Sequence, residues 1–259
     1  MQELTLPPMI KRLTEDCEWH RVTVGMSESK TYRLTGAAAN YFIKFHAADA
    51  VESLLDEKER IEWLQGKLPV PRVATYEKDD AGEYLLITGL AGLDASDKAH
   101  EQALPQLMRL LAEGLRAVHD VPIKECPFNR TLPVVLAEAG RRVELGLVDE
   151  DDFDSSRQGM KAAELYRELL ARAPEEADLV FTHGDYCMPN IVIQDGRVSG
   201  FIDLGRAGIA DRYQDLALAV RSIGYNFGAE YVQLFLTAYG IEEPDQAKIA
   251  YYQLLDEFF

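Results

Sequence analysis

The first third of the chain is patterned mainly as β-strands. Apolar and polar residues alternate over short segments, as they do in strands with one buried face. Such strands are expected at Trp19–Val24, Lys30–Leu34, Asn40–Phe45, Arg72–Tyr76 and Glu83–Thr88. Between the third and the fourth, apolar residues recur at helical spacing and predict one main helix from about Val51 to Gln65.

After residue 92 the apolar pattern becomes helical. Helices are expected at Ala103–Val118, Pro133–Leu145, Ala162–Ala171, Tyr213–Ser222, Ala229–Tyr239 and Asp245–Leu255. Two glycines in Gly89–Gly92 favour a hinge, because glycine adds backbone freedom where two parts of a chain join. The pattern predicts an α+β fold with an N-terminal antiparallel-sheet lobe over 1–88, a hinge over 89–92, and a larger, mainly helical lobe over 93–259.

The stretch from His183 to Arg206, HGDYCMPNIVIQDGRVSGFIDLGR, departs from this pattern. Asp195-Gly196 is a strong two-residue hairpin signal, so strands on either side of it should pair and carry Asn190 and Asp203 to the same end of the hairpin. Mg²⁺ prefers hard oxygen ligands, and a substrate hydroxyl needs a carboxylate such as Asp185 beside it. The spacing predicts phosphoryl transfer, although each of these residues alone is also a common turn former.

HGDYCMPN followed by FIDLGR resembles the signature of the aminoglycoside phosphotransferases, relatives of the protein kinases, and their 3'-phosphotransferase branch in particular. The resemblance continues through 211–215 and 220–223 to the last residues, 254–259, so it covers nearly the whole chain. It implies a bilobal protein-kinase-like fold whose C-terminal lobe carries a helical insertion around 131–172. It also implies an enzyme that moves the γ-phosphate of ATP to a hydroxyl of an aminoglycoside antibiotic, the 3'-hydroxyl in that branch, which confers resistance. Asp185 would be the catalytic base, and Asn190 and Asp203 would hold Mg²⁺.

The resemblance also implies a nucleotide site in the first lobe. Lys44 would contact the α and β phosphates and Glu57 would hold it, with Glu59 as the nearby alternative for that pairing. Ser27, in a polar turn, would cover the phosphates, unless the turn is an ordinary hairpin. The remaining contacts would be stacking of Phe42 on the base, which could equally be a core aromatic, and backbone hydrogen bonds from Thr88 and Leu90. ATP is expected and GTP stays open.

Charge agrees with a cationic partner. The chain has 27 Lys and Arg against 44 Asp and Glu, a net charge of −17, which argues against nucleic acid as a partner. An acidic surface that only maintains solubility is the alternative. Three cysteines without metal-ligand spacing, no apolar run of transmembrane length and no signal-peptide core favour a cytoplasmic protein without a membrane partner, expected as a monomer or weak dimer.

Acidic residues cluster in two segments that the resemblance places around the acceptor sugar. The members are Asp151, Asp152 and Asp154 in one segment, and Asp256, Glu257 and the α-carboxylate of Phe259 at the end of the chain. A solvated loop and a frayed terminus are the respective alternatives. Arg206 would orient these acids or a substrate hydroxyl, or else form a structural ion pair.

Three other functions remain open from sequence alone. Another small-molecule kinase of the same fold, acting on choline, a sugar, homoserine or a macrolide, shares these motifs. A nucleotide-binding pseudoenzyme is disfavoured because Lys44, Glu57, Asp185, Asn190 and Asp203 are all present. A metal-dependent phosphate-ester hydrolase would leave Lys44 and the hinge unexplained.

Overall fold

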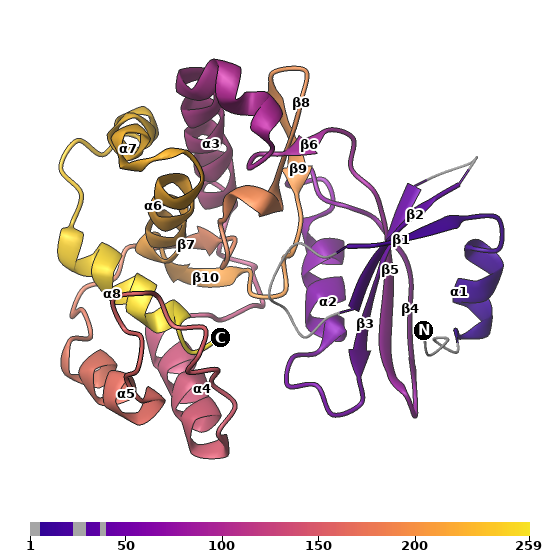
Figure 1. Ribbon diagram of the computed structural model, residues 1–259, viewed down its shortest axis with the longest axis horizontal. Helices are drawn as coiled ribbons and strands as arrows, with labels where there is room; N and C mark the ends of the chain where they lie inside the picture. Colours follow the sequence, from indigo (N-terminus) through magenta and orange to yellow (C-terminus); the bar gives the residue numbers. More distant parts are fainter. Residues whose placement is uncertain (1–5, 23–29, 37–39) are drawn as a thin grey trace. The chain divides into compact units, whose positions relative to one another are not determined.

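The computed structural model describes residues 6–22, 30–36 and 40–259, and the chain divides into two compact units (Figure 1). Unit 1 takes 1–92 together with 192–195 and 199–205. Unit 2 takes 93–191, 196–198 and 206–259. Ser27 lies outside the described residues.

Unit 1 is built on a five-stranded antiparallel sheet of order β1-β2-β3-β5-β4. Its strands are β1 (Glu18–Arg21), β2 (Lys30–Thr35), β3 (Asn40–Ala47), β4 (Val73–Asp79) and β5 (Gly82–Thr88). Strand β3 is central, and its register pairs Lys44 with Thr31 on β2 and with Leu85 on β5. Because side chains alternate along a strand, Phe42 and Lys44 share one face of the sheet and Ile43 and Phe45 the other.

One helix covers each face of this sheet. Ile10 of α1 (Pro8–Leu13) joins Leu34, Ile43 and Leu86 in a fully buried cluster on one face. Helix α2 (Leu54–Leu64) packs against β3, β4 and β5, with Leu54, Ile61 and Leu64 buried.

The start of α2 is fixed by Glu83 on β5. The Glu83 carboxylate accepts the Leu54 N–H at 2.7 Å and the Ser53 hydroxyl at 2.8 Å, and it also accepts from Lys78 at 2.9 Å. Free N–H groups at a helix start require such acceptors. Burial alone would raise the pKa of Glu83, but these donors outweigh it and hold the pKa below its usual value.

Unit 2 is mainly helical. Its helices are η1 (Lys98–Ala103), α3 (Leu104–His119), α4 (Leu132–Leu145), α5 (Ala162–Ala171), η2 (Met188–Asn190), α6 (Tyr213–Phe227), η3 (Ala229–Tyr231), α7 (Val232–Tyr239) and α8 (Gln246–Asp256). Helix α3 packs on α7, and α6 packs on α8 (Figure 1). Leu165 and Leu169 of α5 share a buried cluster with Tyr252 of α8 and Phe258, so the end of the chain is part of the core.

Short strands follow in the second part of the chain, and most of β8 (Ile191–Gln194) and β9 (Arg197–Phe201) belongs to unit 1. Strand β6 (Leu93–Asp94) opens unit 2, and β7 (Leu179–Thr182) pairs antiparallel with β10 (Gly208–Asp211). The connection between β8 and β9 is a tight turn with φ of 49° at Asp195 and 69° at Gly196. Positive φ at both central residues is the requirement of the hairpin turn that Asp-Gly predicts.

The predicted α+β class is confirmed, with an antiparallel sheet carrying one main helix and a mainly helical remainder. Two expected helices need correction. Helix α6 continues to Phe227 instead of ending at Ser222, and the helix expected at 229–239 is a 3₁₀ turn followed by α7. Helix α1 and strand β10 were not predicted. Among the helices of the described residues, none is long and apolar enough to cross a membrane.

Candidate active site

Lys44 lies between two carboxylates in unit 1. Its Nζ is 2.7 and 2.8 Å from the two carboxylate oxygens of Glu57 on α2, and 2.9 Å from Oδ1 of Asp203. The Lys44 and Glu57 side chains are 12% and 5% exposed. Glu59, the alternative partner, is exposed, since a helix turns by about 100° per residue and the two glutamates face different directions. The structure therefore joins Lys44 to Glu57.

The charge state of this cluster follows from its neighbours. Burial disfavours the ammonium form of Lys44, but the carboxylates of Asp203 and Glu57 outweigh burial and raise its pKa. Burial raises the pKa of Glu57, and the positive charge of Lys44 opposes that rise. Lys44 is therefore a fixed cation at neutral pH.

Asp203 has an unusual backbone. It follows β9 with φ of 63°, one of the two positive values among the non-glycine residues that the structure describes. Asp and Asn tolerate this left-handed region better than other residues, yet the conformation still costs free energy. Leu204 behind it is 1% exposed and anchors the turn. The backbone thus leaves the Asp203 side chain 54% exposed while it contacts Lys44.

Asp215 of α6 holds the loop that carries Asp185 through backbone hydrogen bonds. The fully buried Asp215 carboxylate accepts the backbone N–H groups of His183 at 2.7 Å and Gly184 at 2.8 Å, and lies 3.2 Å from His119 Nε2. Gly184 has φ of 86°, and a Cβ there would lie 2.2 Å from the Arg206 carbonyl oxygen. Only glycine fits this turn, which sets the direction of the next residue, Asp185.

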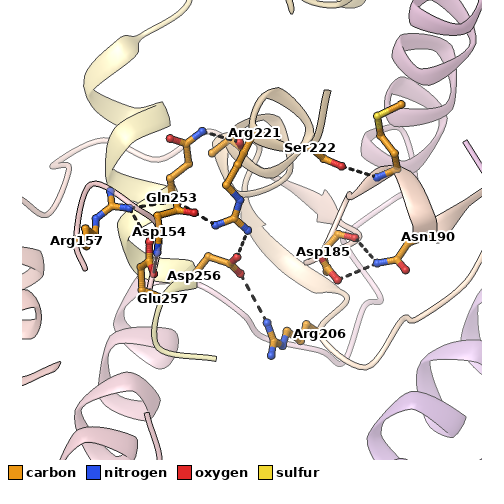
Figure 2. A network of polar contacts seen from close by, with 12 residues as sticks. Asp154, Arg157, Asp185, Asn190, Arg206, Arg221, Ser222, Gln253, Asp256 and Glu257 are labelled. Atoms are coloured by element: carbon orange, nitrogen blue, oxygen red, sulfur yellow. Dashed lines mark hydrogen bonds and ion pairs between the residues drawn. The ribbon is translucent and has the colours of Figure 1, made fainter. Parts of the chain in front are cut away.

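Asn190 lies against Asp185 in unit 2 (Figure 2). Its Nδ2 donates to Asp185 Oδ2 at 2.8 Å and to the Asp185 carbonyl at 3.0 Å. Ser222 Oγ accepts the Met188 N–H at 3.0 Å and ties the intervening turn to α6. Burial and the neighbouring Asp185 carboxylate raise the pKa of the Cys187 thiol well above its usual value, so the thiol is neutral.

The residues expected at the nucleotide base lie near the end of β5. Phe42 pairs with Ile87 on the sheet face that also carries Lys44, and it is half-buried. The Thr88 N–H donates to the Arg72 carbonyl at 2.9 Å, and the Gly89 N–H donates to the Asn40 carbonyl at 2.8 Å. Leu90 is half-buried.

The two acidic segments meet in unit 2, and arginines separate their carboxylates (Figure 2). Asp256 is paired with Arg221 and lies 3.7 Å from Arg206 Nη1. Asp154 lies 3.8 Å from Arg221 Nη1 and 3.3 Å from Arg157 Nη1. Asp151 and Asp152 are exposed. The expected acidic wall is thus partly an ion-pair network.

Phe259 lies among guanidinium groups. The Arg130, Arg142 and Arg206 guanidinium carbons are 5.9, 5.6 and 5.4 Å from its ring centroid, close enough for cation–π attraction. The ring also lines a hollow of about 330 Å³, counting space open to solvent. Its walls are Arg130, Val135, Thr182, Gly184, Arg206, Ala210, Gln214, Leu255, Asp256 and Phe259.

Asp215, Arg157 and Arg221 were not assigned roles from sequence. Asp215 could have been suspected, because a carboxylate among the apolar residues 216–219 must be buried with a partner. Arg157 contacts a residue 100 positions away and carries no sequence signal of that contact.

The residues expected to hold a metal ion are Asn190, in unit 2, which offers an amide oxygen, and Asp203, in unit 1, which offers a carboxylate. In the part of the chain that the structure describes, no three His, Cys, Asp or Glu side chains cluster for metal binding. Mg²⁺ commonly takes only one or two protein oxygens and completes its shell with phosphates and water, so these two residues fit that ion chemically.

Comparisons with known proteins identify the family of this chain. Residues 18–252 match the model of the phosphotransferase enzyme family. An aminoglycoside 3'-phosphotransferase of Niallia circulans is 43% identical over 89% of this chain and 86% of its own. A crystal structure of an aminoglycoside 3'-phosphotransferase of type VIII aligns with a TM-score of 0.87 at 36% identity, covering 97% of this chain and 98% of that one.

A third relative was solved with ligands. An aminoglycoside phosphotransferase from Streptomyces rimosus, in complex with ADP and streptomycin, aligns with a TM-score of 0.83 at 31% identity over 96% of both chains. The match of both sequence and structure extends over nearly the full length. This chain belongs to the phosphotransferase enzyme family, among the aminoglycoside 3'-phosphotransferases.

Proposed function

We propose that this protein transfers the γ-phosphate of ATP to the 3'-hydroxyl of an aminoglycoside antibiotic and so confers resistance to it. The observation that carries the proposal is the Asp185 carboxylate, held by the Asn190 amide on a loop anchored at Asp215. Relatives named aminoglycoside 3'-phosphotransferases support both the substrate class and the position of the hydroxyl.

Asp185 acts on the acceptor. Its carboxylate accepts a hydrogen bond from the substrate hydroxyl, directs the oxygen toward the γ-phosphorus, and takes up the proton as the new P–O bond forms. Asn190 stabilises the carboxylate form, because its N–H donates to Oδ2 at 2.8 Å. Asp185 can therefore accept a hydrogen bond from the substrate hydroxyl while it is a carboxylate.

Lys44, held by Glu57, acts on the donor. The ammonium group neutralises charge on the α and β phosphates, and Glu57 prevents it from turning away. Asn190 and Asp203 would hold Mg²⁺, which supplies neutralisation of the phosphate oxygens when bound. Ser27 would cover the phosphate chain.

The base would lie against Phe42 near residues 88–90. Since the Thr88 N–H already serves the Arg72 carbonyl, the group that Thr88 offers to a base is its own carbonyl. A carbonyl accepts from the amino group of adenine and repels the corresponding keto oxygen of guanine. With Leu90 donating its N–H to the ring, this arrangement supports ATP over GTP. Because ATP is a cytosolic metabolite, we place the protein in the cytoplasm.

The acceptor would lie against the two acidic segments of unit 2. Asp151, Asp152 and Asp154 from the loop, and Asp256, Glu257 and the Phe259 carboxylate from the terminus, would face the ammonium groups of the sugar rings. Arg206, beside Asp256, would orient that acid. A cleft that excludes part of the water strengthens such attraction. Exposed Asp151 and Asp152 are the most accessible of these acids.

A coupled ADP-release assay across aminoglycosides tests the proposal. Kanamycin-like and neomycin-like compounds should be turned over, and analogues that lack the 3'-hydroxyl should not be. Choline, homoserine, simple sugars and a macrolide serve as rival acceptors. Turnover of a rival acceptor alone would replace the proposed substrate, and ADP release without a phosphorylated product would indicate hydrolysis.

A further inference from the structure

Ion pairs connect the two acidic segments of unit 2 in a row of alternating charge (Figure 2). In order, the row is Arg206, Asp256, Arg221, Asp154, Arg157 and Glu257. Each carboxylate therefore has an arginine beside it, and the row as a whole is electrically neutral. A polycationic substrate that approaches these carboxylates meets acids that already have internal counterions.

Arg157 lies between carboxylates of the two acidic segments that the proposed function assigns to the substrate. One guanidinium nitrogen, Nη1, is 2.6 Å from Glu257 Oε1 and 3.3 Å from Asp154 Oδ2. The other oxygen of Glu257 accepts the Asp154 backbone N–H at 3.0 Å. A cation shared by two carboxylates from separate segments is the arrangement that the substrate would make.

Exposure indicates that this pairing can be exchanged. The Arg157 side chain is 18% exposed and Asp154 is 43% exposed, whereas Glu257 is 4% exposed. The buried Glu257 keeps a cation close because an unpaired buried charge is costly. Asp154 and Arg157 reach solvent, so an incoming cation can replace the guanidinium on Asp154.

Further carboxylates lie beside the row. Desolvation raises the pKa of Asp152, and the carboxylates of Asp149 and Asp154 add to that rise, although Arg221 opposes it. Loss of one arginine charge would leave the row itself with a net negative charge that attracts cations.

We propose that Arg157 is a specificity-determining residue that competes with substrate ammonium groups for Asp154, while the buried Glu257 keeps the guanidinium close. The inference rests on the proposed function. Arg157 weakens the binding of every polycation, and it does so most for compounds that carry the most amino groups near these acids. It therefore sets the range of accepted aminoglycosides.

The test uses two charge variants and a matched control. Arg157→Gln removes the charge, and Arg157→Lys keeps it but lacks the planar fork that serves two acids at once. Arg172→Gln, at the far end of α5, also removes one positive charge from an ion pair, with Glu168, but lies outside the row. Binding of a neomycin-type and a kanamycin-type compound is measured by calorimetry without nucleotide, and kcat and KM are measured by ADP release.

Arg157→Gln should tighten binding of the neomycin-type compound roughly fivefold and that of the less charged kanamycin-type compound by less. KM should fall while kcat stays unchanged, and the gain should shrink at high salt. Arg157→Lys should tighten binding of the neomycin-type compound roughly twofold, and it replaces the Gln variant if that variant fails to fold. Arg172→Gln should bind both compounds as the wild type does.

Weaker binding of both compounds by both Arg157 variants would show a purely structural residue and overturn the inference, as would affinities equal to the wild type. If either result were found while the wild type still phosphorylated aminoglycosides, only the role of Arg157 would be rejected and the proposed function would stand. Conversely, aminoglycoside binding that responds to Arg157 without any turnover would contradict the proposed function alone. Absence of binding to the wild type would reject both.

Discussion

Lys44 Nζ lies 2.9 Å from Oδ1 of Asp203 while it also contacts Glu57. The residue proposed to hold the phosphates thus contacts the residue proposed to hold the metal. On the proposed function, Asp203 would exchange the ammonium group for a metal ion and Lys44 would exchange the Asp203 carboxylate for phosphates when the nucleotide binds. The Lys44–Glu57 pair can remain in place during that exchange.

Lys44→Met should destabilise the protein by about 3 kcal/mol or more, because it leaves the buried Glu57 carboxylate without its partner. Lys44→Met combined with Glu57→Met should recover most of that free energy, since both charges are then absent. Urea unfolding measures the stability, and ADP release measures the activity. Both variants should lose ATP turnover.

Recovery of stability without activity separates the two roles of Lys44. If the double variant were as unstable as the single one, the loss would come from packing around residue 44 rather than from the uncompensated Glu57 charge.

Asp185→Asn should lower kcat by about 10²- to 10⁴-fold, because the amide cannot accept the hydroxyl proton. Affinity for ATP, measured by calorimetry, should stay nearly unchanged. Asp195→Asn, in the hairpin turn where φ is 49°, is the control, since Asn tolerates that backbone and lies outside the proposed chemistry. Substantial turnover by Asp185→Asn would remove Asp185 from the central role.

Glu83→Gln should destabilise the protein by about 1 kcal/mol at neutral pH, because the charged acceptor at the start of α2 is lost. The pKa of Glu83 is lowered in the folded protein, so its stabilising effect is present above the ordinary glutamate pKa and is lost as pH falls through the lowered value. Thermal unfolding of both proteins from neutral to acidic pH should show two curves that converge in acid. A stability difference that stays constant across this pH range would mean that the charge of Glu83 does not stabilise the start of α2.

Gly184→Ala should cost about 1–3 kcal/mol more than Gly66→Ala, although both glycines have similar φ values of 86° and 77°. At Gly184 the new Cβ would lie 2.2 Å from the Arg206 carbonyl, whereas at Gly66 no described heavy atom lies within 4 Å. Only Gly184→Ala should also reduce kcat, because it displaces the neighbouring Asp185. Equal unfolding midpoints of the two variants in urea would show that the Arg206 backbone shifts to make room for the new Cβ.

Elements with a strong local pattern could be predicted from the sequence. Helix α5 begins and ends where its apolar spacing indicates, and Asp195-Gly196 makes the expected turn. Strand β10 could not be predicted, because its four residues form a strand only through pairing with β7, which lies about thirty residues earlier in the chain. Helix α1 is six residues long and depends on the burial of Ile10 under the sheet.

The candidate site shows the same division. The family resemblance implied the Lys44–Glu57 pair and named Asp185 and Asn190 as site residues, and the structure brings the members of each pair into contact. The ion pairs of Arg157 and Arg221 depend on where the loop and the terminus meet in space. Spacing within either segment contains no information about that meeting, so the acids and Arg206 could be named from the sequence but Arg157 and Arg221 could not.

The orientation of Asn190 explains why an amide suits this position. Both contacts with Asp185 use Nδ2, so the amide oxygen faces away from the carboxylate and can turn toward a cation. An aspartate at 190 would place a second carboxylate at hydrogen-bonding distance from Asp185, and two like charges at that distance raise the proton affinity of the pair. A proton held by that pair would compete with the hydroxyl hydrogen for the Asp185 carboxylate. With asparagine, one end of the side chain holds the Asp185 carboxylate through an N–H, and the other end offers the metal ion an oxygen.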